Sequence, residues 1–374
     1  MGHILDHDFK NVRKPFLEAE SLPPECYTDQ QFFDRETETI FKKSWLFVGR
    51  EEKIPNSGDY FVIELLGHSI IITRSADGKV NAFHNICSHR GAHMLDGQGN
   101  AKLIRCPYHS WTYSPGGELV RAPDMEQTCE FDPAENGLQK IELATWAGFI
   151  FVNFAENPAS LSDQLGDLPE RFAPYNIADM VCVREREDII DTNWKLYQEV
   201  DMEDYHAPSV HPESIGQQVF PRLPSHGNYE TTFFEFKRTV SVMSTDRGDV
   251  FPHIEGISGK CAEGTHFTMI YPGFFLVNTL DSMWWINKIP ISPEKTYVRS
   301  GFCFPKATTE RSDFDEISAR YHKRWDLVVD EDNEITARHQ KGIRSPFAKP
   351  GRLSFHEEVV NAMNIWILDK VLNK

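Results

Sequence analysis

Two short segments, Cys87–Gly91 (CSHRG) and Cys106–Trp111 (CPYHSW), carry the densest ligand chemistry of the chain. Sixteen residues separate His89 from Cys106. Each segment offers one thiolate and one imidazole. Gly and Pro residues in and near both segments (Gly91, Gly97, Gly99 and Pro107) let the backbone approach a bound group closely. The segments therefore predict a bound metal group with two Cys and two His ligands: Cys87, His89, Cys106 and His109.

Two kinds of metal group fit these four ligands. Two thiolates and two imidazoles can hold a tetrahedral zinc ion, but zinc fingers favour a Cys pair followed by a His pair. In a Rieske-type [2Fe–2S] cluster, two His replace two Cys on one of the irons. Each segment here mixes one Cys with one His, so each loop could reach both irons. The spacing favours the cluster.

The sequence around the two segments indicates a small β-rich domain. Short β-branched or aromatic runs at 60–66, 69–74 and 80–83 alternate with the turn signals Gly67–His68 and Asp77–Gly78. The β character persists to Asn153. We expect this domain to span residues 41–155.

The rest of the chain predicts a second domain, made of residues 1–40 and 156–374. Strands are expected at 231–240, 266–271, 274–279, 283–289 and 297–304. We expect these strands to pair in one antiparallel sheet. Helices are expected at 29–45, 161–172, 188–211, 313–341 and 357–372. The fold class is therefore α+β.

Composition excludes several classes of function. The net charge is −17, with 39 Lys and Arg against 56 Asp and Glu, which argues against nucleic acid or an anionic membrane as partner. The 7 Cys are odd in number and scattered, which favours free thiols in a reducing compartment, the cytoplasm. Residues 1–14 lack the apolar core of a signal peptide.

A second cluster of ligands lies at 193–211, where His206 and His211 are five residues apart. On an ideal helix they would lie about 140° apart, but Pro208 breaks the helix between them. Glu203 lies three residues before His206, on its face. Two imidazoles and one carboxylate make the facial triad of non-heme Fe(II) oxygenases. An acidic run alone is more often a solvated surface.

Together these motifs resemble the ring-hydroxylating oxygenase α-subunit family. The resemblance implies a [2Fe–2S] cluster with Cys87 and Cys106 on one iron and His89 and His109 on the other. It also implies a mononuclear Fe(II) held by His206, His211 and Asp332 in a helix-grip domain, with O₂ as co-substrate. Asp330 and Glu331 are the alternatives to Asp332.

The resemblance further implies an assembly. In the family, the cluster of one subunit passes electrons to the iron of its neighbour through a carboxylate, here Glu203 linking His109 with His206. A homotrimer is expected. In having Glu at this position, the chain resembles the family members that act on quaternary amines, such as carnitine and glycine betaine oxygenases. No GxGxxG fingerprint for NAD or flavin is present, so a reductase, with or without a ferredoxin, must supply electrons.

The substrate is the least determined feature. We expect pocket residues among the aromatic and Met side chains of the strands and the segments between them: Phe234, Met243, Met269, Phe275 and Trp285. Such a pocket suits a quaternary ammonium or an apolar N-alkyl compound such as an anilide herbicide. Few basic residues lie on these strands, which disfavours a carboxylated substrate. Oxidative N-dealkylation is the first expectation. Aromatic-ring hydroxylation, a Rieske electron carrier without oxygenase activity and a zinc-stabilised binding protein are the alternatives.

Overall fold

The structure is a computed structural model that describes residues 9–373. The chain forms two compact units, one made of residues 45–158 and the other of residues 1–44 with 159–374. The expected boundaries, 41 and 155, lie close to these. Residues 1–8, part of the segment in which the sequence predicts no signal peptide, lie outside the described residues. None of the helices in the described part of the chain combines the length and apolar character that crossing a bilayer requires.

The smaller unit is almost entirely β-structure in three antiparallel sheets, in the orders β1-β10-β9, β4-β3-β2-β5 and β6-β7-β8. Its strands are β1 (Leu46–Arg50), β2 (Asp59–Leu65), β3 (His68–Arg74), β4 (Val80–His84), β5 (Gln98–Asn100), β6 (Ile104–Arg105), β7 (Thr112–Tyr113), β8 (Leu119–Arg121), β9 (Glu142–Trp146) and β10 (Phe149–Asn153). Cys87 and Cys106 belong to its buried core, together with Trp111 and Tyr113. The expected β-rich domain is confirmed.

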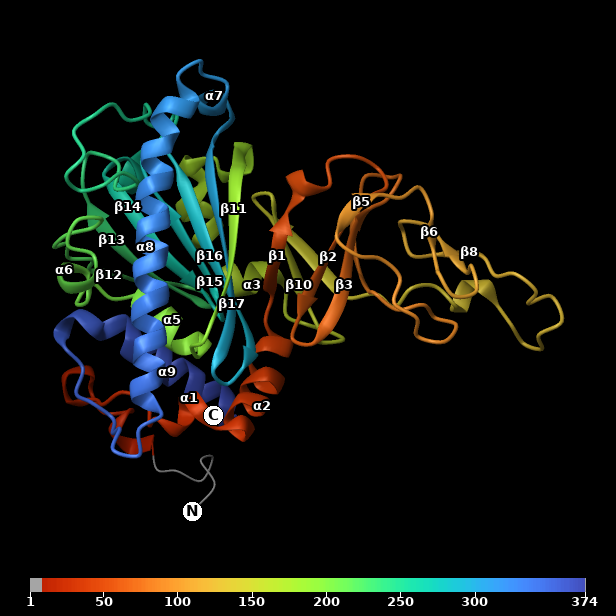
Figure 1. Ribbon diagram of the computed structural model, residues 1–374, viewed down its shortest axis with the longest axis horizontal. Coiled ribbons are helices and arrows are strands. Elements are labelled where there is room, and N and C mark those ends of the chain that lie inside the picture. Colours follow the sequence, from red (N-terminus) through yellow and green to blue (C-terminus); the bar gives the residue numbers. More distant parts are fainter. Residues whose placement is uncertain (1–8, 374) are drawn as a thin grey trace. The chain divides into compact units, whose positions relative to one another are not determined.

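The larger unit is built on one antiparallel sheet, as expected (Figure 1). The sheet has seven strands in the order β11-β17-β16-β15-β14-β13-β12, two more than the five expected. Its strands are β11 (Met180–Ile190), β12 (Arg222–Leu223), β13 (Tyr229–Glu235), β14 (Gly264–Ile270), β15 (Phe274–Asn278), β16 (Met283–Ser292) and β17 (Lys295–Pro305). Its longer helices are α2 (Gln30–Thr39), α5 (Trp194–Asp201), α8 (Phe314–Ile343) and α9 (Glu358–Val371). Short helices α1 (Glu25–Thr28), α3 (Leu161–Leu165), α4 (Leu168–Phe172), α6 (Ala207–Val210) and α7 (Lys306–Thr309) complete it.

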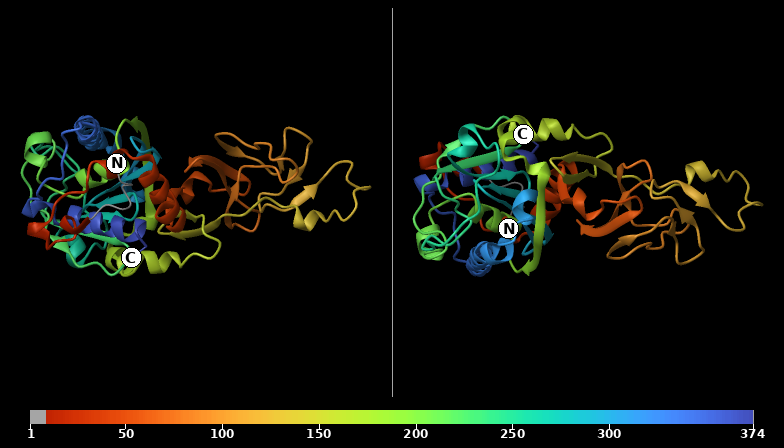
Figure 2. Two further views of the ribbon diagram at one scale, coloured as in Figure 1. Left: turned by 90° about the horizontal axis from the view of Figure 1, so that it is seen from below. Right: turned by 90° about the horizontal axis from the view of Figure 1, so that it is seen from above.

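The long helix α8 packs across one face of this sheet. Figure 1 shows it crossing the strands, and Figure 2 shows it nearly end-on, to one side of them. Trp325 of α8 stacks on Phe302 of β17, with ring centroids 4.6 Å apart and planes 8° apart. Arg184 of β11 forms a bidentate ion pair with Asp326 of α8 at 2.9 Å. These contacts fix which residues of α8 face the sheet.

Four sequence expectations differ from the structure. The helix expected over 29–45 is shorter, because α2 ends at Thr39. The sequence predicts a helix over 188–211, but the edge strand β11 includes Asp188, and only α5 and α6 within this segment are helical. The charges of β11 that pair with α8 are Arg184 and Arg186. Strand β13 ends at Glu235, before the expected 240. The helix expected at 161–172 divides at Gly166, which has φ +54 and would place a Cβ 1.6 Å from the carbonyl oxygen of His226.

Gly301 shows how closely the sheet's other face is packed. It lies opposite Trp285 in the β16–β17 pairing, and a Cβ at Gly301 would meet the Trp285 indole at 2.2 Å. Because successive side chains of a strand point to opposite faces, Trp285 lies on the face away from Trp284, which contacts Arg324 of α8. Trp285 is thus buried on the face of the sheet opposite α8.

Gly301→Ala should therefore destabilise the protein, by about 1–3 kcal/mol, because the indole must move. Gly342→Ala is the matched control, since nothing lies within 4 Å of its Cβ position near the end of α8. That change should stabilise by about 0.5–1 kcal/mol. Urea unfolding followed by tryptophan fluorescence measures both. Equal effects of the two substitutions would contradict the packing described.

Candidate metal centres

Three ligand atoms from two distant segments meet in the larger unit. One ligand atom each from His206, His211 and Asp332 lies within 4.8 Å of the others. The carboxylate of Asp332 is 2.9 Å from His211 Nε2 and 3.8 Å from His206 Nε2. His211 is 1% exposed and Asp332 5%, so both are shielded from bulk water. The structure thus brings together the three residues that the sequence singled out.

Each imidazole has a second carboxylate behind it. Glu203 accepts from His206 Nδ1 at 2.5 Å and also from the backbone N–H of His206 at 3.0 Å. Glu331 accepts from His211 Nδ1 at 2.7 Å, and Ser214 donates its hydroxyl to the same carboxylate oxygen. These bonds orient both imidazoles so that their Nε2 atoms point toward Asp332. Glu331, which the sequence left as an alternative ligand, contacts Nδ1 of His211 and does not lie among the three ligand atoms.

The loop between α5 and α6 is held by Asp204. One of its carboxylate oxygens accepts from the backbone N–H of Phe220 at 2.7 Å, and the other forms an ion pair with His356. The His356 ring stacks on Tyr205, with planes 7° apart. His206 then caps the short helix α6, in which Pro208 is an early residue, and His211 follows its end. A helical break therefore aims both imidazoles at one point.

This donor set fits a single iron ion. Two imidazole nitrogens with one carboxylate leave several coordination positions open, which is the arrangement of non-heme iron oxygenases. The carboxylates of Glu203 and Glu331 on the outer nitrogens supply the supporting shell that metal-bound His residues require. Asp330, the other alternative ligand, instead accepts from Arg186 at 2.6 Å. Among the described residues, Asp332 is the carboxylate best placed for the ion.

In the smaller unit, the two Cys–His loops share one backbone design. The N–H of Gly91 donates to the carbonyl of Cys87 at 2.9 Å, and that of Ser110 donates to the carbonyl of Cys106 at 3.1 Å. Gly91 has φ 73° and Ser110 has φ 60°, so each loop turns through the left-handed region at the same point. Two similar turns therefore present one thiol and one imidazole each.

The four side chains of these loops form one group. The rings of His89 and His109 lie 4.8 Å apart between centroids, and His89 stacks on Trp111 at 4.7 Å. His89 Nδ1 is buried and has no hydrogen-bond partner among the described residues. Cys87 and Cys106 are both 2% exposed and free. Two free buried thiols beside two imidazoles, one of them with an orphaned nitrogen, fit a [2Fe–2S] cluster.

Tyr113 was missed in the sequence analysis. Its hydroxyl lies 3.2 Å from Cys87 Sγ and accepts from the backbone N–H of Ser88 at 3.1 Å. Because Ser88 donates to it, the hydroxyl proton is free to point at the sulfur. Hydrogen bonds to cluster sulfurs help to set the reduction potential. The only signal in the sequence was its position two residues after Trp111.

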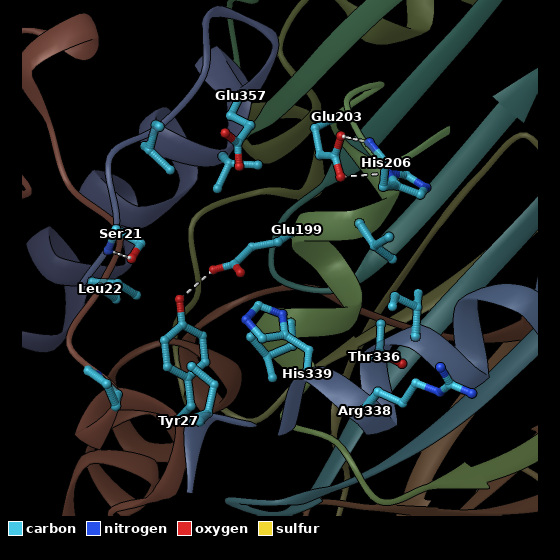
Figure 3. Close-up of a pocket in the computed structure, with 18 of the residues that line it drawn as sticks. Ser21, Leu22, Tyr27, Glu199, Glu203, His206, Thr336, Arg338, His339 and Glu357 are labelled. Atoms are coloured by element: carbon cyan, nitrogen blue, oxygen red, sulfur yellow. Dashed lines mark hydrogen bonds and ion pairs between the residues drawn. The ribbon is translucent and has the colours of Figure 1, made fainter. Parts of the chain in front are cut away.

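A cavity of about 660 Å³ opens on the outer side of Glu203 (Figure 3). Glu199, Glu203 and Glu357 line it together with Tyr27 and His339. Tyr27 donates its hydroxyl to Glu199 at 2.7 Å. Burial raises the pKa of Glu199 to about 7, and the neighbouring carboxylates add to this. Three carboxyl groups therefore face one hollow beside His206.

The expected substrate-pocket residues divide into three groups. Strand pairing puts Phe234, Met269 and Phe275 on the face of the sheet that α8 covers. Met243 lies in the loop that follows β13, outside the strands. Trp285 points to the opposite face, so we no longer expect it in a pocket beside His206 and Asp332. Neighbouring residues of a strand face opposite sides of the sheet, so Trp284, and not Trp285, lies on the face that α8 covers.

The raised pKa of Glu199 predicts a stability change with pH. Its ordinary value is 4.5 and its folded value about 7, so the folded state holds a proton that the unfolded state has released between these pH values. This group's contribution to stability should therefore fall as the pH rises through that window. Glu199→Gln removes the penalty and can still accept from Tyr27. We expect a gain of about 2 kcal/mol at pH 8 and almost none near pH 4.5.

Thermal or urea unfolding at a series of pH values checks this expectation. Glu213→Gln, at an exposed position, is the control and should show no comparable pH-dependent gain. A gain for Glu199→Gln that is equal at pH 5 and pH 8 would contradict the account.

Two protein-family models match the chain. The Rieske [2Fe–2S] domain matches residues 44–142, and the ring hydroxylating alpha subunit (catalytic domain) matches residues 172–373. The matched ranges contain the two groups of ligands described above. They imply a [2Fe–2S] cluster, a mononuclear iron and O₂ as co-substrate.

Similar proteins agree with these matches. The glycine betaine monooxygenase oxygenase subunit of Chromohalobacter salexigens is 28% identical over 95% of this chain and 86% of its own. The carnitine monooxygenase oxygenase subunit of Escherichia coli is 36% identical over 57% of this chain and 58% of its own. Among solved structures, a quaternary ammonium Rieske monooxygenase has a TM-score of 0.83 at 24% identity, covering 97% of this chain and 98% of that one.

The fold is shared more widely. Naphthalene 1,2-dioxygenase from Rhodococcus has a TM-score of 0.80 at 20% identity, over 99% of this chain and 98% of that one. With more than half of the sequence matched by the catalytic-domain model, this chain belongs to the ring-hydroxylating oxygenase α-subunit family and is a Rieske-type oxygenase.

Proposed function

We propose that the protein is the terminal oxygenase component of a multicomponent monooxygenase that removes an alkyl group from the nitrogen of a quaternary ammonium compound. The main support is that two His and one carboxylate form a site with open coordination positions, and that Glu203 binds the outer nitrogen of His206. The relatives named for glycine betaine and carnitine support this substrate class. An apolar N-alkyl compound such as an anilide is an alternative substrate for the same reaction, with less support.

Seven residues hold the two metal groups in this proposal. Cys87 and Cys106 would ligate one iron of the cluster, and His89 and His109 the other. The mononuclear iron would be held by the remaining three: His206, His211 and Asp332. When bound, the cluster supplies single electrons and the mononuclear iron supplies O₂ activation. Glu203 and Glu331 keep the imidazoles oriented throughout turnover.

The overall reaction balances as a monooxygenation. One atom of O₂ enters an N–CH₃ carbon–hydrogen bond of the substrate, and the other leaves as water after two electrons and two protons are taken up. The product is a carbinolamine, in which the nitrogen–carbon bond breaks to release the amine and formaldehyde. His211 and Asp332 are almost fully buried, which limits the access of bulk water to the reaction and so helps to prevent unproductive discharge of electrons.

Glu203 would join two subunits. Its carboxylate holds His206 on one side, and its other side lines the 660 Å³ cavity beside Glu199 and Glu357. We propose that His109 of a neighbouring subunit approaches Glu203 there, in a homotrimer. A reductase, directly or through a ferredoxin, would reduce the cluster, since no nucleotide-binding fingerprint is present in the sequence.

The reaction type is tested by product analysis. The holoprotein, supplied with electrons by a generic reductase, should release formaldehyde in step with O₂ consumption from N-methylated quaternary compounds. Mass spectrometry should find the substrate minus one methyl group. A phenol or ring diol from aromatic compounds, with no aldehyde from any N-alkyl compound, would replace this proposal with ring hydroxylation.

The residue roles are tested by a pair of substitutions. Glu203→Gln should leave both metal sites loaded yet lower turnover about 100-fold or more, because the bridge loses its charge. Asp332→Asn should retain the cluster and lose the mononuclear iron. Iron and acid-labile sulfide analysis, with single-turnover kinetics, separates the two outcomes. Full coupled activity of Glu203→Gln would refute the bridge.

A further inference from the structure

One cation inside the larger unit has no counterion in contact. Arg324 of α8 is 2% exposed, and its Nε and Nη1 atoms are buried without a hydrogen-bond partner among the described residues. None of the ion pairs found in residues 9–373 includes it. Burial lowers the pKa of Arg324 to about 10, so the guanidinium is still charged at neutral pH. A buried charge without a partner is costly, which makes this arrangement informative.

Other arginines that contact or belong to the same helix are neutralised. Arg184 pairs with Asp326, and Arg320 pairs with Asp246 at 2.6 Å. Another buried cation, Lys288 of β16, forms an ion pair with Asp201. Arg324 therefore differs from these cations in lacking an anion in contact, although it is also buried.

The guanidinium lies against an indole that also lacks an acceptor. Its central carbon is 5.3 Å from the ring centroid of Trp284, and Trp284 Nε1 is buried with no hydrogen-bond partner among the described residues. The edge of Trp284 meets Phe275, with centroids 6.1 Å apart and planes at 90°. Stacking on Trp284 attracts the cation, but it leaves the N–H donors of both side chains unused.

Arg324 and the iron-ligand candidate Asp332 are both buried residues of α8. Arg324 precedes Asp332 by eight residues, which is about 12 Å along the helix axis. The charges of Asp332 and Glu331 favour its protonated form. Both carboxylates, however, are engaged with His211. The two carboxylates act on Arg324 only through their electrostatic field, and the guanidinium remains free to bind another anion.

We propose that Arg324, assisted by the Trp284 N–H, binds an anionic group of the substrate, most simply a carboxylate. The preferred substrates are then zwitterions, with a methylated ammonium group near His206 and Asp332 and a carboxylate toward Arg324. A planar guanidinium suits a carboxylate because it can donate two parallel hydrogen bonds. The strands alone offer few free cations, and this one comes from the helix. The inference rests on the proposed N-dealkylation and specifies its substrate.

The test compares two probes that differ only in charge. γ-Butyrobetaine carries a carboxylate, and its carboxamide has the same trimethylammonium group and chain length without the anion. Arg324→Met in the holoprotein should raise the Kd for γ-butyrobetaine about 30- to 100-fold and leave the Kd for the amide within about twofold. Binding is measured by calorimetry and by quenching of tryptophan fluorescence. Formaldehyde release should show the same selective loss in kcat/KM.

Two further variants keep the result interpretable. Lys323→Met removes the same charge from the exposed neighbouring position and should change neither Kd. If Arg324→Met fails to fold, Trp284→Phe keeps the ring and removes the N–H, and should weaken only γ-butyrobetaine, by about 3- to 10-fold. Equal affinity of the wild-type protein for both probes would overturn the inference. Aldehyde release from both probes at equal rates would overturn it while leaving N-dealkylation intact, whereas no aldehyde from either would fail the proposed function itself.

Discussion

The approach of one carboxylate to two imidazoles is the contact on which the larger unit depends. Asp332 belongs to α8, whereas His206 and His211 flank the short helix α6 more than a hundred residues earlier. They meet because Trp325 and Asp326 fix α8 against β17 and β11. A helix rotates each residue by about 100°, so a shift of one position in α8 would turn Asp332 away from both imidazoles. Packing of an apolar helix face thus sets the geometry of a polar site.

Electrostatics at the site follows from the same packing. Carboxylates crowd around the imidazoles: Glu203 and Glu331 on the outer nitrogens and Asp332 on the inner side. Such a concentration of negative charge would be unfavourable alone, and a bound cation offsets it. Further out, burial raises the pKa of Asp201 to about 6 and that of Glu199 to about 7. Part of the net charge of −17 therefore has a local purpose around the iron.

The ligands of the cluster and most strands of the large sheet were predictable from the sequence. The segments Cys87–Gly91 and Cys106–Trp111 carry ligand chemistry in their spacing, and strands β14 to β17 carry strong β-branched and aromatic patterns. Strand β11 was missed because its charges resemble a solvated helix, whereas they pair with α8. The face on which Trp284 and Trp285 lie depends on register, which a single strand's composition does not fix. Arg324 could not be assigned to the site because it belongs to a helix and not to the pocket strands, and its burial beside Tyr321 and Val328 follows only from how α8 packs.

Anomalous diffraction at the iron edge, from crystals of the iron-loaded protein, tests the central claim most directly. Two separate peaks are expected in each chain. One should be an elongated peak between Cys87, His89, Cys106 and His109, and the other a single-atom peak bounded by His206, His211 and Asp332. A single peak, or a second peak away from Asp332, would contradict the assignment of α8 as the helix that completes the iron site.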